Sequence, residues 1–128
     1  MSESPLPPVP DPNPGGQLLI YHDGGLNLQV RLDGQTVWLT QAGIAELFQT
    51  TPQNITIHIG SIYDEGELSE AATCKEYLQV RTEGGRQVQR SLKHYSLDLI
   101  LAVGYRVRSP RGTQFRQWAT VQLRELLT

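Results

Sequence analysis

Residues 40–63 constrain the fold of this chain more than any other segment. Two short amphipathic runs are separated by Thr51 and Pro52. The residue before a proline is disfavoured in helical geometry, so the first helix must end before Pro52. Pro52 then fits the first turn of a second helix, where its missing N–H costs nothing, and Thr40 is suited to cap the first. The segment predicts a helix-turn-helix whose second helix covers residues 52–63.

Apolar side chains in this segment recur at helical spacing. Those of the first helix fall at i, i+3 and i+4, and those of the second are four and three residues apart. They are Ile44, Leu47 and Phe48, followed by Ile55, Ile59 and Ile62. Ala45 supplies the small residue that a close crossing of the two helices requires, but the turn lacks the usual glycine. Paired helices of this kind also occur in proteins that bind no DNA.

The polar side of the second helix predicts contact with DNA. Gln and Asn pair with adenine in the major groove, and Thr or Ser contacts bases or phosphates. The amino-terminal end of a recognition helix faces the base edges. The candidate DNA-contacting residues are Thr51, Gln53, Asn54, Thr56 and His58. The alternative is that Gln, Asn and Thr are here only common first-turn residues.

Positive charge is concentrated after residue 80. Residues 1–80 hold ten acids and two cations, a balance of −8, whereas residues 81–128 hold nine cations and three acids, a balance of +6. Eight of those nine cations are arginine, whose planar guanidinium suits phosphates and base edges. A split of this kind indicates a binding partner. It also suits head-to-tail self-association, while the alternative is ordinary solvated arginines near helix ends.

Short β signals flank the helix pair. Residues 17–39 alternate apolar and polar side chains around Asp-Gly turns and predict a small antiparallel meander. Residues 77–92 predict a second hairpin, at the position of the wing in winged helix proteins. Its candidate phosphate contacts are Arg81, Arg86 and Arg90. The acidic residues 64–67 would oppose phosphate, so they are expected to point away from DNA.

A third helix, capped by Ser96 and apolar nearly all round, is expected at residues 97–105 as the buried centre of the core. The basic segment 106–116 follows as a loop that leads into an amphipathic last helix. Its candidate anion contacts are Arg106, Arg108, Arg111 and Arg116. With equal support, these arginines hold helix carbonyls and acids of the amino-terminal half.

The predicted fold class is α+β, a winged helix-turn-helix-like domain over residues 17–128 with small antiparallel hairpins and about four helices. Residues 1–16 contain six prolines and are expected to form a disordered arm. The single Cys74 suits a reducing cytoplasm. We find neither a secretory signal nor a run of about 18 apolar residues, so no membrane association is expected.

Catalytic and metal-binding signals are weak. The three histidines are scattered, without a second ligand at metal spacing. Cys74 beside Lys75 could be an activated thiol, but nothing else supports a nucleophile site. The glycine pairs lie in turns or in the arm rather than between a strand and a helix. We therefore expect no enzymatic activity, no cofactor and no metal.

A set of short motifs from residue 37 onward is distinctive. The motifs are VWLTQA (37–42), ELF (46–48), NI (54–55), HI (58–59), EGEL (65–68), KEY (75–77), YSLD (95–98), VGYRV (103–107), RGTQFR (111–116) and WAT (118–120). Together they resemble the amino-terminal domain of the virulence RhuM proteins over roughly residues 17–126. That domain is in turn similar to the amino-terminal modules of phage antirepressors and BRO proteins.

The resemblance implies a bacterial domain that binds double-stranded DNA and regulates transcription at mobile elements or at stress or virulence loci. A homodimer is compatible with this role. The alternative is a protein-interaction module that regulates or positions a toxin of the Fic or Doc type, or another partner, without binding DNA. Some RhuM-like proteins carry such a toxin domain or a longer helical carboxy-terminal part, so the chain is expected to be an isolated or truncated domain.

Overall fold

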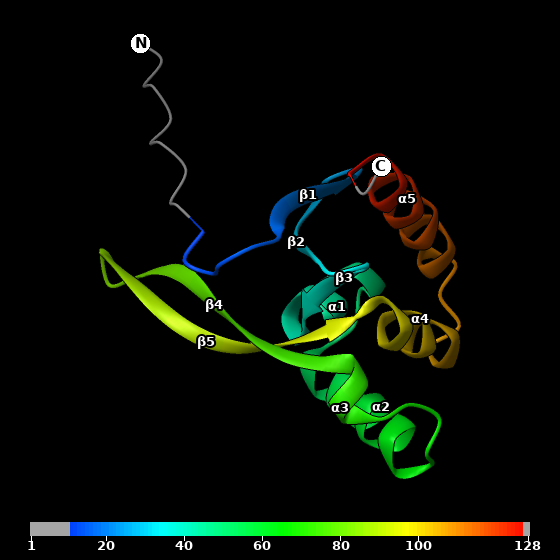
Figure 1. Cartoon of the computed structure of the whole chain (residues 1–128). Helices are drawn as coiled ribbons and strands as arrows, with labels where there is room; N and C mark the ends of the chain where they lie inside the picture. Colours follow the sequence, from blue (N-terminus) through cyan, green and yellow to red (C-terminus); the bar gives the residue numbers. More distant parts are fainter. Residues whose placement is uncertain (1–10, 127–128) are drawn as a thin grey trace.

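A computed structural model describes residues 11–126 as one five-stranded sheet with helices packed on one of its faces (Figure 1). The strands are β1 (Gln17–Asp23), β2 (Leu26–Asp33), β3 (Thr36–Thr40), β4 (Cys74–Glu83) and β5 (Arg86–Ser96). The helices are α1 (Gln41–Phe48), α2 (Pro52–Asp64), α3 (Glu70–Thr73), α4 (Leu97–Arg106) and α5 (Arg111–Leu126). The predicted α+β class is confirmed.

All neighbouring strands are antiparallel, in the order β1-β2-β3-β5-β4. The expected meander and hairpin both form. They are joined in one larger sheet, because β5 runs four residues beyond the predicted end and pairs with β3. Trp38 lies opposite Ser96, and Thr40 lies opposite His94. The finer prediction of a winged helix-turn-helix is not confirmed, since the hairpin is here the edge of a larger sheet.

The helix pair forms as the sequence predicts, with α2 one residue longer. Thr40 accepts a hydrogen bond from the Gly43 amide at 3.0 Å, and Thr51 accepts one from the Asn54 amide at 3.1 Å. Gln49 ends α1 in the left-handed region, with φ of 54°. Glycine is the usual residue in that conformation, so Gln49 takes the place of the glycine missing from the turn.

The core lies between the helices and one face of the sheet. Alternating residues of β2 and β3 form one core with the apolar sides of α1, α2, α4 and α5. The fully buried side chains include Val30, Val37, Leu39, Ile44, Ile55, Ile62, Leu99, Ile100 and Phe115. Phe115 packs edge-on against Tyr21 of β1, with ring centroids 5.1 Å apart. This packing fixes α5 against the β1–β2 end of the sheet.

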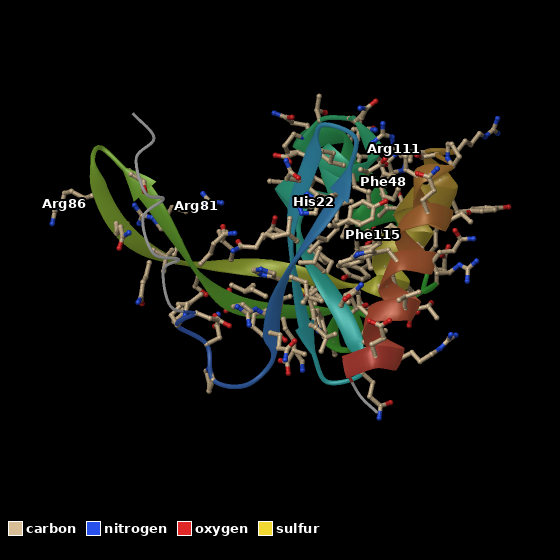
Figure 2. All side chains as sticks on the ribbon, turned by 90° about the horizontal axis from the view of Figure 1, so that it is seen from above. His22, Phe48, Arg81, Arg86, Arg111 and Phe115 are labelled. Atoms are coloured by element: carbon tan, nitrogen blue, oxygen red, sulfur yellow. The ribbon has the colours of Figure 1, made fainter. Side chains whose placement is uncertain are left out.

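Gly104 of α4 allows Phe48 of α1 to pack closely against the carboxy-terminal helices. A Cβ atom at Gly104 would lie 2.8 Å from the Phe48 ring, and one at Gly112 would lie 3.7 Å from it. Figure 2 shows Phe48 between the sheet and α5, near Phe115. The close approach explains the glycine in VGYRV, whereas a methyl group at Gly112 would meet the ring at an ordinary van der Waals distance.

Several expectations for the second half need correction. The four-residue α3 was not predicted, so the described residues hold five helices rather than about four. Ser96 stands at the amino terminus of α4 but its hydroxyl makes no capping bond. The helix is buried on one side only, because Tyr105 is 87% exposed. Residues 111–116 are the first turns of α5 rather than part of a loop.

The proposed division at residue 16 remains a prediction. Residues 1–10 of the expected arm lie outside the described residues. Residues 11–16 lie against the sheet: Asp11 pairs with Arg31, and the Asn13 side chain bonds the backbone of Leu78. Within residues 11–126, we find no helix with the length and apolar character needed to cross a membrane.

Candidate nucleic-acid interface

The solvent-facing side of α2 carries the residues predicted to contact DNA. Gln53 and Thr56 are exposed, His58 is half-buried, and Ile57 is 65% exposed. Among the described residues, the Gln53 amide has no hydrogen-bond partner. Ile57 was not predicted as a contact, although an apolar side chain among polar ones at helical spacing could have signalled it.

The other polar residues of this helix already have partners. The Asn54 Nδ2 atom donates to the Thr50 hydroxyl at 2.9 Å, and the Thr56 hydroxyl donates to the Pro52 carbonyl at 3.0 Å. Thr51 caps the helix. These bonds stabilise the first turn of α2 and the turn before it, so Gln53 is the amide most available to a ligand.

Gln41, at the first position of α1, joins the two helices. Its Nε2 atom donates to the Pro52 carbonyl at 2.8 Å and to the Thr56 hydroxyl. These bonds hold the amino-terminal ends of α1 and α2 side by side. Sequence reasoning missed this role, and the only available signal was a long polar side chain directly after a capping threonine.

A cleft of about 550 Å³ lies between these two helix ends and the β4–β5 hairpin. Gln41 and Pro52 line one wall, and Arg81 and Lys93 line the other. The amino-terminal end of a helix carries partial positive charge and free N–H groups, so the cleft attracts anions from both walls. Glu76 is the one acid in the described lining.

The hairpin projects away from the body of the molecule, with Arg86 near its tip (Figure 2). Residues 74–96 contain five cations and two acids, a balance of +3. The cations are Lys75, Arg81, Arg86, Arg90 and Lys93, and the acids are Glu76 and Glu83. This hairpin is therefore the main basic element next to α2.

Arg90 is already paired within the hairpin. Its Nη2 atom lies 2.8 Å from Glu83, and hydrogen bonding to this guanidinium lowers the pKa of the Glu83 carboxyl. The Arg81 Nε atom donates to the Gln79 amide oxygen at 3.1 Å, so its charge is not neutralised. No ion pair involves Arg86 within residues 11–126. Arg81 and Arg86 thus remain available to an anion.

The arginines of residues 106–116 lie elsewhere. Arg106 donates to Glu65 and, at 3.2 Å, to Glu67, and these bonds raise its pKa. Arg111 lies 3.7 Å from Asp23. Figure 2 places Arg111 beside α5, across the molecule from Arg81 and Arg86. The sequence left open whether these arginines bind anions or pair with acids of the amino-terminal half. In the structure, Arg106 and Arg111 pair with such acids.

The remaining two arginines of that segment, Arg108 and Arg116, are exposed. Arg108 has a φ of 56°, in the left-handed region, directly after α4. The twelve predicted residues therefore do not form one surface. Of the predicted residues, Arg81 lines the cleft beside Pro52 at the start of α2, and the segment 106–116 lies on the α4–α5 side (Figure 2).

The chemistry of the isolated titratable groups gives no support to a nucleophile. Burial raises the pKa of the Cys74 thiol, whereas an activated thiol needs a lowered one. Burial lowers the pKa of His94, which favours its neutral form. Within residues 11–126, no three His, Cys, Asp or Glu side chains are grouped to hold a metal ion.

Comparison with known families adds one finding. Residues 72–128 match the model of the virulence protein RhuM family. Over this carboxy-terminal part, the chain is similar to the RhuM family. No curated protein and no solved structure gives a significant match.

The RhuM match begins in α3 and covers the hairpin, α4 and α5. It therefore includes the basic hairpin and both glycines that pack on Phe48. The helix pair α1–α2 precedes the matched segment, so its assignment rests on the sequence pattern and the geometry described above.

Proposed function

We propose that this RhuM relative binds double-stranded DNA through the α1–α2 helix pair and the β4–β5 hairpin. The observation that carries the proposal is the cleft in which the amino-terminal ends of both helices face Arg81 and Lys93. Helix amino termini and cationic side chains are the groups that proteins use to hold phosphates. The helix pair and the hairpin would act as one site.

The two elements would have different tasks. The α2 helix lacks Lys and Arg, so its contribution is recognition of bases. The Gln53 amide suits adenine, and Ile57 suits the methyl group of thymine. The hairpin supplies the electrostatic attraction, because Arg81, Arg86 and Lys93 can neutralise phosphates.

The biological role that we propose is regulation of transcription in the bacterial cytoplasm, at mobile elements or at stress or virulence loci. A homodimer belongs to this proposal, because paired half-sites lengthen the DNA sequence that a small domain reads. The relation to the RhuM family supports the setting, and the cleft supports the binding mode.

The test is fluorescence anisotropy with a labelled duplex of random sequence, over a range of salt concentrations. We expect saturable binding at low salt and a loss of affinity in a variant that combines Arg81→Ala with Lys93→Ala. Arg124→Ala on α5 is the matched control and should bind as the wild type does. Absence of saturable binding at about 50 mM salt would contradict the proposal.

The second candidate is a protein-interaction module that regulates or positions a Fic-like or Doc-like toxin, or a carboxy-terminal partner domain. The exposed Tyr105, next to Arg108 on the α4 side, favours it, because exposed Tyr and Arg are enriched at binding hot spots. A purified Fic-type toxin domain that binds wild type but not Tyr105→Ala, together with no DNA binding, would favour this candidate.

A further inference from the structure

The sheet face opposite the helices contains a groove that the proposed DNA site does not use. Its volume is about 550 Å³, and β1 and β4 form its two walls. Three of its apolar residues are unusually open to solvent, with Leu18 38%, Ile20 48% and Leu78 37% exposed. Such a row of exposed aliphatic side chains on either side of a cavity is typical of a binding groove.

The floor of the groove is a buried arginine. Arg31 is 3% exposed, and its guanidinium carbon lies 4.9 Å from the centre of the Tyr77 ring. The Tyr77 hydroxyl donates to Asp33 at 2.6 Å, so the ring under Arg31 is held in place. A buried cation requires an anionic partner. Because Arg31 lines the groove, such a partner can reach its guanidinium through the groove.

Residues 11–13 of the chain itself supply that partner. Both carboxylate oxygens of Asp11 bond the Arg31 guanidinium, at 2.7 Å and 2.9 Å. Two residues later, the Asn13 side chain donates to the Leu78 carbonyl and accepts from the Leu78 amide, both at 2.8 Å. Asn13 therefore makes the pair of bonds that a neighbouring strand would make.

The bonds between Asn13 and Leu78 lie on the open side of β4. β4 is an edge strand, and edge strands present backbone N–H and C=O groups that accept an added strand. Asn13 caps one such pair, at Leu78. Residues 11–13 form a turn, in which the Asn13 amide donates to Asp11 at 3.1 Å, and they place a carboxylate in the groove and a side-chain amide on the strand edge.

The arm leaves the floor incompletely satisfied. The Nε atom of Arg31 is buried and has no hydrogen-bond partner within the described residues. An unpaired buried donor is costly, so residues 11–13 do not satisfy Arg31 completely. The arm also joins β1 through Gly15 and Gly16, both with φ of 72°, a joint of low steric restriction.

We propose that this groove is a binding site for an extended acidic segment of a second protein, which residues 11–13 occupy in cis. An aspartate of the partner pairs with Arg31, and its next residues add to the open edge of β4 at Leu78. The arm competes with that segment and lowers its apparent affinity by the fraction of molecules in which the groove is closed. The residues that line this groove are different from those that line the proposed DNA cleft.

The probe is a fluorescent peptide with the sequence of residues 7–16, added to the full chain. In the double variant Asp11→Asn with Asn13→Ala, the arm is released, and we expect at least tenfold tighter peptide binding than in wild type. The same peptide with its aspartate replaced by asparagine should not bind. Glu46→Gln, which removes an exposed carboxylate of α1, is the control and should match wild type.

Three results would overturn the proposal. The first is a folded double variant, shown by circular dichroism, that binds no peptide. The second is equal binding of the aspartate and asparagine peptides. The third is a wild-type dimer that the double variant converts to a monomer in sedimentation, because the occupant would then be the arm of a second copy.

The role of Arg31 is tested separately, because losing a buried arginine can unfold the chain. Arg31→Lys keeps the charge but removes the planar pair of donors. In the arm-released background, we expect it to weaken peptide binding at least tenfold with the thermal transition retained. Unchanged binding would show that the carboxylate is not held by the guanidinium, against the proposal.

Discussion

The arginines of the hairpin and those of residues 106–116 have the same chemistry but opposite surroundings. Arg81 and Arg86 extend from a projecting hairpin without a carboxylate partner among the described residues, whereas Arg106 and Arg111 face Glu65, Glu67 and Asp23. The second group neutralises acids of the amino-terminal half. The arginines of the basic half therefore fall into two groups, one on the proposed binding surface and one paired with acids of the same chain.

The largest effect is expected at the packing that supports the α4 side. In Gly104→Ala, the new Cβ would approach the Phe48 ring to 2.8 Å, and overpacking of this kind destabilises by about 2 kcal/mol. Urea unfolding measures it. Gly60→Ala in α2 is the control, because nothing lies within 4 Å of the position that its new methyl group would take; it should stabilise by about 0.5 kcal/mol. Equal stability of the two variants would refute the close packing.

The buried ion pair of Arg31 with Asp11 differs from both groups, and it should make the stability of the chain depend on pH. Hydrogen bonding to Arg31 lowers the Asp11 pKa from 3.8 to about 2. Because the folded-state pKa is the lower one, this stabilisation is present above about pH 4 and is lost as pH falls towards about 2. After discounting for solvent screening we expect about 1 kcal/mol. Thermal melts at neutral pH and at about pH 2.5 should differ less in Asp11→Asn than in wild type, and an identical difference would contradict the pairing.

A smaller effect is expected at the turn between α1 and α2. Gln49 holds a φ of 54°, which glycine adopts without steric cost. Gln49→Gly should therefore stabilise the chain by about 0.5 kcal/mol. Gln49→Ala keeps the strain and should give no gain. Destabilisation by glycine in chemical unfolding would show that the turn has another conformation.

The smallest effect separates the two arginine groups directly. Arg106→Ala removes the bonds to Glu65 and Glu67 and should lower the thermal midpoint slightly, because exposed ion pairs contribute little. Arg86→Ala has no such bonds to lose and should leave the midpoint unchanged. Differential scanning calorimetry of both variants compares them; a larger loss in Arg86→Ala would reverse the assignment.

Local features were predictable from the sequence because they depend on neighbouring residues. Thr40, Thr51 and Pro52 fix the ends of the helix pair, and Gly84 with Gly85 fixes the hairpin turn. The pairing of β3 with β5 was missed, since no short-range pattern states which distant strands meet. The contact of Asp11 with Arg31 was missed for the same reason.

The sequence predicted that the arginines after residue 80 are important, but it did not predict which of them are free to bind an anion. Residues 106–116 hold four arginines and no acid, and residues 77–92 hold three arginines and one acid. Only the folded chain places Glu65 beside Arg106. Lys93 was overlooked because it lies one residue beyond the predicted hairpin, and Gln41 because the first helix was analysed for its apolar side chains. The cleft is formed by residues that are close in the folded chain but far apart in the sequence.

The central claim is that the hairpin, rather than the segment 106–116, carries the electrostatic binding of DNA. The most direct measurement is the salt dependence of duplex binding for two double variants, Arg81→Ala with Arg86→Ala and Arg106→Ala with Arg111→Ala. We expect the hairpin variant to reduce the slope of log K against log salt by about two, one for each lost phosphate contact, and the other to leave it unchanged. An unchanged slope in the hairpin variant, or a reduced slope only in the other, would contradict the account.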